Sequence, residues 1–279
     1  MKKYEALAPA GSFDAIIPMI EAGADAIYVG IEGFSSRPKQ IDFSLEQIRD
    51  AVKLCHNHNV KLYVAVNVGI SEKDAEKVKE SIFAVDSFGA DAVILADYGF
   101  VSFFSHKLKN AALHASTLLG AYNIEDARLL RDMNVKRLIL YANLYIDEIA
   151  AITNAVPELE YELVAEGGTC FNDIRQCLLP HTFINGEHKL FCRERYRLES
   201  MGVASPAKPI CEYANKVAEV LGVYMGAGVS SFKIEGRTVP YQERIEAVKR
   251  VRNAIDSFKK SGSAKAYMHY FSRANREMF

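Results

Sequence analysis

The sequence predicts a single α/β domain, a (β/α)8 TIM-like barrel with a long cysteine-bearing insertion after its seventh strand. Two observations support this prediction. Short apolar runs alternate with longer amphipathic segments along most of the 279 residues. Two near-copies, EAGADAIYVG and SFGADAVILA, also stand where a helix gives way to a strand. A repeated β/α unit in a chain of this length has the size of a barrel that closes on itself. A doubly wound open sheet is the alternative fold.

The apolar runs are the predicted strands. Several are almost continuously apolar, as is typical of parallel strands that are covered on both faces. A third junction, GAGVSSFKI, resembles the other two loosely and contains the last run. The runs are Tyr4–Ala8, Ala26–Gly30, Lys61–Val66, Ala92–Ala96, Ala111–Ala115, Arg137–Tyr141, Glu160–Ala165 and Ser230–Ile234.

The segments between these runs have the apolar spacing of helices, with suitable residues at their ends. Ser44 with Gln47 predicts a capping box. Gly23 and Gly89 stand just before predicted strands, where a helix commonly ends on glycine. The predicted helices are Ser12–Ala22, Ser44–His58, Glu72–Phe88, Ile124–Met133, Ile146–Ala155, Tyr213–Leu221 and Val239–Lys260.

Composition limits the classes of function. With a net charge of −1, the chain is not expected to bind nucleic acid strongly without specificity. Arg193, Arg195 and Arg197 form one local basic cluster, which is more often a solvated face than a binding site. No apolar run is long enough to span a membrane, and the N-terminus lacks the apolar region of a signal peptide. We therefore expect one cytoplasmic domain over residues 1–279.

Four of the five cysteines fall in one segment, residues 166–211, after the predicted seventh strand. Its glycines and prolines predict a long irregular excursion. In a reducing compartment, clustered cysteines more often bind metal or do redox chemistry than form disulfides, although free buried thiols are the alternative. The paired knuckles of structural zinc are absent, so the spacing fits an iron–sulfur cluster somewhat better, with zinc as the other metal. The predicted ligands are Cys170, Cys177, Cys192 and Cys211.

Polar residues follow the predicted strands at the end where a barrel has its active site. The cysteine segment leaves from the same end. Lys233, Glu235 and Arg237 alternate in sequence and so could face one side, although an internal ion-pair network is the other interpretation. The predicted catalytic residues, which we expect to line a cavity beside the metal, are His114, Glu166, Lys233, Glu235 and Arg237.

Five stretches in order resemble peptidase family U32, the collagenase-like proteins. They are LAPAGSFDAIIPMIEAGADAIYVG, LHASTLLGAYN, EGGTCFNDIRQCLL, SSFKIEGR and the closing helix. The family typically has His where Glu166 stands and Gly where Arg175 stands, which indicates a divergent branch. The chain is also similar to the UbiU/UbiV-type iron–sulfur proteins. That resemblance implies a [4Fe-4S] cluster on the same four cysteines, and we interpret Cys55, which has no counterpart in the pattern, as structural.

The resemblance implies oxygen-independent hydroxylation of a ring substrate by this chain or by a complex that contains it. The ring is either a quinone precursor or an RNA base, and the near-neutral charge slightly favours the smaller molecule. The family name implies a peptidase instead, although no Ser-His-Asp or HExxH arrangement stands in the sequence. A non-catalytic metal-binding maturation subunit is a third possibility. A related protein partner could complete the site.

Overall fold

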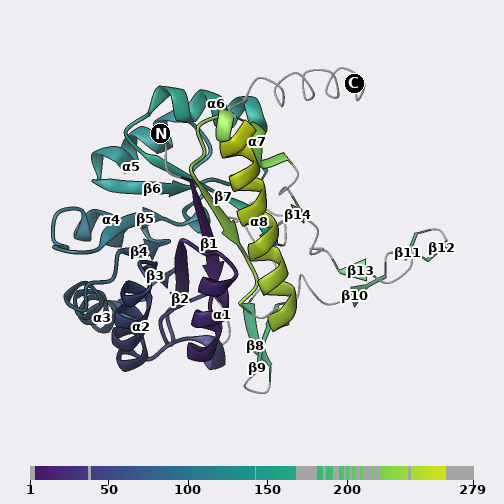
Figure 1. Cartoon of the computed structure of the whole chain (residues 1–279). Coiled ribbons are helices and arrows are strands. Elements are labelled where there is room, and N and C mark those ends of the chain that lie inside the picture. The colour runs from purple at the N-terminus through teal and green to yellow at the C-terminus, as the bar shows by residue number, and fades with distance from the viewer. Residues whose placement is uncertain are drawn as a thin grey trace.

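Figure 1 shows the fold as a computed structural model, in which helices surround a central barrel of strands. The structure describes residues 4–36, 39–141, 143–167, 181–184, 187–190, 195–197, 199–200, 203–204, 208–209, 215–216, 220–237 and 240–261.

Eight parallel strands close into one ring. The sheet order is β7-β15-β1-β2-β3-β4-β5-β6, and β6 pairs with β7 to complete it. Each strand coincides with one of the predicted apolar runs, so the predicted barrel is confirmed and the open sheet is excluded. The strands are β1 (Glu5–Pro9), β2 (Ala26–Gly30), β3 (Lys61–Val66), β4 (Ala92–Leu95), β5 (Ala112–Ala115), β6 (Val135–Ile139), β7 (Glu160–Gly167) and β15 (Ser231–Ile234).

The helices between the strands begin and end largely where their end residues predict. Ser44 and Gln47 form the predicted capping box of α2. Gly23 and Gly89 have positive φ angles of 103° and 84° just after helices, a conformation that glycine adopts without strain. The helices on the first six connections are α1 (Ile16–Glu21), α2 (Leu45–Asn57), α3 (Ala75–Ser87), α4 (Tyr98–Phe104), α5 (Ile124–Asp132) and α6 (Ile146–Ala155).

Two parts of the helix prediction are wrong. The sequence pattern missed α4, whose aromatic, Gly and Ser residues are weak helix formers but which Asp97 caps through the Phe100 amide. The predicted helix over Tyr213–Leu221 is replaced by strand β14 (Asn215–Lys216), which pairs antiparallel with the end of β7, and α7 (Leu221–Gly226) follows it. Backbone pairing with an existing strand end overrides a weak helical periodicity there.

Aliphatic side chains on the outer face of the barrel pack against the helices and form the main core. The side chains that face the interior are different, because only a small apolar cluster lies there. It consists of Leu7, Ala26, Tyr28, Tyr63, Ala65, Ala92, Ile94 and Ile139. Charged side chains share the interior with this cluster, among them Glu5, Arg137 and Glu162, and this places chemistry inside the barrel.

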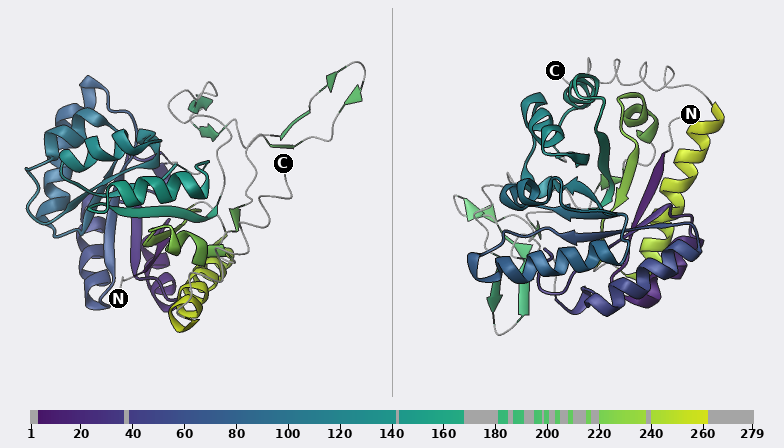
Figure 2. Two further views of the ribbon diagram at one scale, coloured as in Figure 1. Left: turned by 90° about the horizontal axis from the view of Figure 1, so that it is seen from above. Right: turned by 90° about the vertical axis from the view of Figure 1, so that its left-hand side faces the viewer.

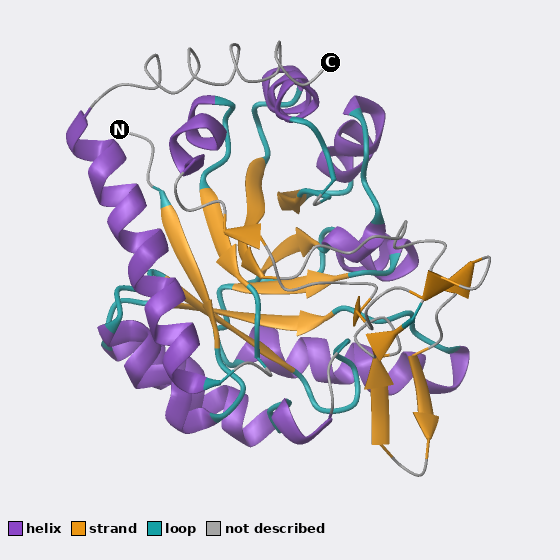
Figure 3. Ribbon diagram, turned by 90° about the vertical axis from the view of Figure 1, so that its right-hand side faces the viewer, coloured by secondary structure: helices purple, strands orange, loops and turns teal. Residues whose placement is uncertain are grey.

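Helix α8 (Tyr241–Ser261) packs along β1, β15 and β7 and covers that side of the barrel in Figure 3. Arg252 ties it to the start of β2, since its Nη1 lies 2.8 Å from Asp25 Oδ2. No helix in the described ranges is long and apolar enough to cross a membrane.

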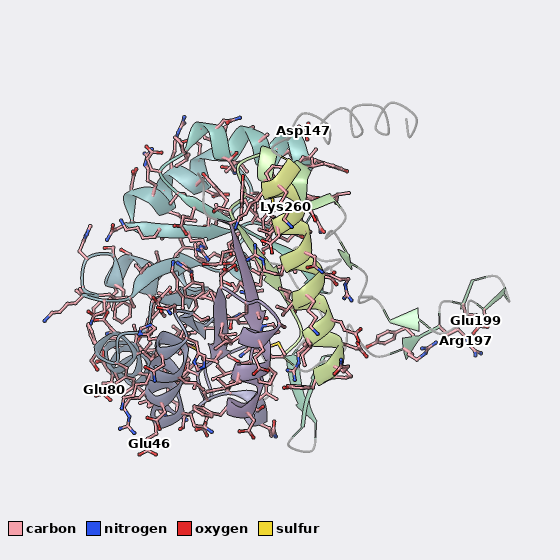
Figure 4. All side chains as sticks on the ribbon, viewed as in Figure 1. Glu46, Glu80, Asp147, Arg197, Glu199 and Lys260 are labelled. Carbon is pink, nitrogen blue, oxygen red and sulfur yellow. The ribbon has the colours of Figure 1, made fainter. Side chains whose placement is uncertain are left out.

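Short antiparallel pairs lie outside the barrel wall in Figure 2. They are β8 (His181–Ile184) with β9 (Glu187–Leu190), β10 (Arg195–Tyr196) with β13 (Lys208–Pro209), and β11 (Glu199–Ser200) with β12 (Val203–Ala204). Figure 4 shows Arg197 and Glu199 well away from the barrel. All these pairs fall between β7 and β15, where the sequence predicts the cysteine-bearing insertion.

Candidate functional site

An ion-pair network fills the N-terminal half of the barrel interior. Arg137 on β6 donates to Glu5 Oε1 at 2.6 Å, to Glu162 Oε2 at 3.2 Å and to Ser231 Oγ at 3.2 Å. The Tyr63 hydroxyl donates to Glu5 Oε2 at 2.7 Å. Burial alone would raise the pKa of Glu5, but Arg137 beside it outweighs burial and holds the pKa below its ordinary value. We call these five residues the interior network, and they form a charged floor beneath the barrel mouth.

Lys233 lies nearer the mouth, two residues along β15 from Ser231. Its Nζ is 3.3 Å from Glu162 Oε1 and 4.3 Å from the centroid of the Tyr28 ring. Burial lowers the pKa of Lys233, while the Glu162 carboxylate opposes this shift. The Lys233 side chain keeps 13% exposure and that of Glu162 has 0%. Lys233 is therefore the member of this pair that solvent still reaches.

His114 faces the interior from β5, in register with Arg137 on β6. Its ring packs edge-on against Tyr63 with centroids 4.9 Å apart. Its Nδ1 is buried and has no hydrogen-bond partner within the described part of the chain. Burial lowers the pKa of His114 well below its ordinary value, and the charges of Arg137 and Lys233 act in the same direction. The imidazole is therefore neutral at neutral pH and has a free nitrogen for a proton or a ligand.

A second charged group, the mouth cluster, consists of Arg237, Asp42 and Ser35. Arg237 Nη1 lies 3.1 Å from Asp42 Oδ1, and its Nη2 lies 3.3 Å from Ser35 Oγ. Gly30, the last residue of β2, makes room for this contact. A Cβ atom there would lie 2.0 Å from Arg237 Nη1 and 2.1 Å from Asp42 Oδ1. The cluster joins the loop after β2 to the end of β15.

Glu166 is directed toward a helix. It pairs with Ile234, a residue of the outer core, because the register between β7 and β15 shifts by one residue at Ala165. Such a bulge changes the face on which the following side chain lies. The carboxylate accepts two hydrogen bonds of 3.1 Å from Arg250 on α8. A catalytic role for Glu166 stays a prediction, and its carboxylate already has a partner.

Glu235 lies against the point where the cysteine segment begins. Its backbone N–H donates to the Glu166 carbonyl at 2.7 Å. Gly167 has a φ of 149°, and a Cβ atom there would lie 2.5 Å from Glu235 Cβ. Only glycine fits this conformation and this close approach. Glu235 and the start of the cysteine segment are thus in direct contact.

The predicted metal ligands lie outside the described residues, so the cluster stays a prediction. They are Cys170, Cys177, Cys192 and Cys211. Cys55 on α2 is free and buried, and burial raises its pKa to about 12. Its thiol is therefore protonated and unreactive at neutral pH. Within the ranges that the structure describes, no group of three or more His, Cys, Asp or Glu residues could hold a metal ion.

The sequence prediction did not identify the interior network. Glu5, Arg137 and Glu162 belong to predicted strands whose other residues are mostly apolar. A charged residue within a strand that is covered on both faces needs a buried partner. The presence of a charged residue in a mostly apolar strand was therefore the signal that could have identified Glu5, Arg137 and Glu162. Asp42 of the mouth cluster offered no such signal, because it stands in a polar loop.

The geometry defines a (β/α)8-barrel protein whose polar groups gather inside the barrel and at its mouth. The chain belongs to peptidase family U32, whose family model matches residues 11–278. The predicted resemblance is confirmed.

Two curated relatives match most of this chain. A tRNA hydroxylation protein P of Helicobacter pylori is 26% identical in an alignment 281 residues long, gaps included, that covers 92% of this chain and 66% of that protein. A 23S rRNA 5-hydroxycytidine synthase of Escherichia coli is 29% identical over 264 residues, which cover 88% of this chain and 40% of that protein. The chain thus spans just under two thirds of the first relative and less than half of the second.

Among solved structures, a U32 peptidase aligns with a TM-score of 0.57 at 12% identity, over 85% of this chain and 94% of that one. At that identity the likeness shows the barrel fold alone.

We predict that Gly30→Ala destabilises the protein by about 1–3 kcal/mol, the usual cost of overpacking. The new methyl group would force Arg237 and Asp42 apart at the mouth. Urea unfolding at neutral pH measures the effect. Gly69→Ala is the matched control, since a Cβ atom there meets nothing within 4 Å. Equal stability of the two variants would contradict the close packing described here.

We predict that His114 makes the fold less stable in mild acid. Its pKa is lowered in the fold, so the unfolded chain binds the proton first, at its ordinary pKa of about 6.5. The stabilisation is complete above that pH and is lost as the pH falls below it. Between about pH 7.5 and about pH 5.5 the loss from this residue is about 1 kcal/mol.

Urea unfolding of wild type and His114→Gln at both pH values isolates this contribution, because the other titrating groups act in both proteins. If the two proteins lose the same stability, His114 is not held neutral in the fold.

Proposed function

We propose that this chain is an oxygen-independent hydroxylase of an RNA base, or the barrel subunit of one. The observation that carries the proposal is the similarity to hydroxylation proteins of tRNA and rRNA along about nine tenths of the chain. The near-neutral charge had favoured a smaller ring, such as a quinone precursor. The relatives redirect the proposal to RNA, because both are named for hydroxylation of an RNA and one of them for 5-hydroxycytidine, a nucleoside with a hydroxylated base.

We propose further that a [4Fe-4S] cluster binds to Cys170, Cys177, Cys192 and Cys211. Support comes from the donor set, since four thiolates are the usual ligands of such a cluster. Topology also supports it, because all four cysteines follow the mouth end of β7 and precede α7. When bound, the cluster would supply one-electron redox chemistry. Zinc is the alternative metal.

The barrel's own residues would bind the base and move protons. His114 fits the proton acceptor better than Glu166 does, because its Nδ1 is buried without a partner among the described residues, whereas Glu166 is held by Arg250. Glu235 would lie between the mouth and the cysteine segment, as its contact with Gly167 indicates. Arg237 would shape the mouth through its pairing with Asp42.

The family name favours a peptidase as the second function. A hydrolase would need an activated nucleophile or water, and the carboxylates of Asp42 and Glu166, which could activate one, are instead engaged in ion pairs. A non-catalytic subunit that serves metal maturation is the third possibility. The experiments below distinguish the hydroxylase from the peptidase.

We predict that anaerobic reconstitution loads about four irons per chain. Changing any one of the four predicted ligands to Ala should abolish the visible absorption of the cluster. Cys55→Ala is the control and should load fully, because the Cys55 thiol is buried in the core and protonated. Loss of loading in Cys55→Ala alone would overturn the ligand assignment. A colourless protein that retains zinc would indicate the alternative metal.

We predict that deleting the gene removes one hydroxylated nucleoside from tRNA or rRNA in cells grown without oxygen. Nucleosides from purified RNA are separated and identified by mass spectrometry. Wild type should restore the modification, and Cys170→Ala should not. If the RNA is unchanged and a hydroxylated quinone is lost instead, the substrate is a quinone precursor and not an RNA base. Peptide cleavage by cluster-free protein would establish the peptidase instead.

A further inference from the structure

Lys233 is an amine directed into the interior of the barrel. It lies on β15 in register with Leu7 of β1, a residue of the small inner apolar cluster. The Tyr28 ring lies on one side, 4.3 Å from Nζ, and Glu162 lies 3.3 Å away on another. A lysine in such surroundings loses much of its hydration, which favours the neutral amine.

The groups around Lys233 provide a proton acceptor and further positive charge. Glu162 Oε1, the oxygen that faces Lys233, has no other hydrogen-bond partner among the described residues. Arg137 already occupies the second oxygen of Glu162. The charge of Arg237 lowers the pKa of Lys233 after the larger effect of burial, and Glu162 and Glu235 raise it. Glu162 can therefore take a proton from the ammonium group without leaving its place.

A purely structural ion pair would not need this arrangement. A buried pair has little net value for stability unless both charges are fully hydrogen-bonded. Glu162 is completely buried, whereas the Lys233 side chain keeps 13% exposure. The amine is thus reachable on one side and has an acceptor on the other, as nucleophilic lysines require.

We propose that Lys233 is a covalent site for a small carbonyl compound, an aldehyde or a ketone, which it binds as an imine. Glu162 takes one proton from the ammonium group. The free amine attacks the carbonyl carbon, so that a C–N bond forms and the C=O π bond breaks. Loss of one water molecule, with the proton returned from Glu162, leaves the iminium ion. The carbonyl compound and the ammonium group thus give an iminium ion and water, and no oxidant or reductant is needed.

The imine chemistry needs no metal, and its test is separate from that of the proposed hydroxylase, although the sequence also predicts Lys233 to line the hydroxylase cavity. An iminium ion withdraws electrons from the neighbouring carbon and so activates the bound carbonyl compound for proton loss or addition. The barrel would then have two chemistries, one at the floor of the mouth and one in the cysteine segment.

The test is reductive trapping on the full chain with acetaldehyde and cyanoborohydride at neutral pH, under limiting reagent. Peptide mass spectrometry then reports the ethylated lysines. We expect Lys233 to be modified several-fold more than Lys260, which is exposed at the end of α8 (Figure 4). Exposed lysines stay protonated at this pH and react slowly.

Lys233→Arg keeps the charge but cannot form an imine, and it should abolish the preferred adduct. Lys61→Met is the matched control, because Lys61 is exposed at the start of β3, at the opposite end of the barrel. This substitution should leave the Lys233 adduct unchanged. Modification of exposed lysines with Lys233 untouched until the protein is unfolded would overturn the proposal. Lys233 would then be only the counter-ion of Glu162. Neither outcome changes the result of the nucleoside experiment.

Discussion

The guanidinium of Arg137 is the constraint around which the barrel is arranged. It is almost completely buried, with 4% exposure, and its charge is met by carboxylates from β1 and β7. Removing one partner of such a buried pair costs about 3–5 kcal/mol, because the remaining charge stays without compensation. The same network includes Ser231 of β15. Four of the eight strands are thereby joined through one side chain, and β6 and β7, the pair that closes the ring, are among them.

The interior and the mouth use different physical means to hold charge. Inside, charges neutralise one another at short distance, and Tyr63 belongs to both the network and the apolar cluster, since its ring packs in the cluster while its hydroxyl donates to Glu5. At the mouth, the charged pair of Arg237 and Asp42 fits only because Gly30 beside it has no side chain. Burial raises the pKa of Asp42, although Ser35 and Arg237 act against it. The Asp42 carboxylate is therefore less fully compensated than the Glu5 carboxylate of the interior network, whose pKa is lowered.

Much of the fold could be predicted from the sequence because each strand is an apolar run bounded by helix end signals. The barrel prediction failed locally at α4, where propensity is weak, and at Asn215–Lys216, where pairing with β7 decides the conformation. The site was harder. Alternation predicted that Lys233, Glu235 and Arg237 could face one side, but it could not show the one-residue shift at Ala165 that turns Glu166 toward Arg250. Such a shift depends on a partner strand that lies far away in the sequence.

The arginines of α8 affect the order in which parts of the protein fold. Arg244 donates to the Arg237 carbonyl at 3.0 Å, Arg250 holds Glu166, and Arg252 holds Asp25. A ribosome makes α8 after all eight strands. A nascent chain whose barrel strands have already left the ribosome still lacks these three contacts, which α8 makes at β15, at β7 and at the start of β2. The mouth therefore reaches its final geometry only when this helix has emerged, which delays assembly of the site until the barrel wall is complete.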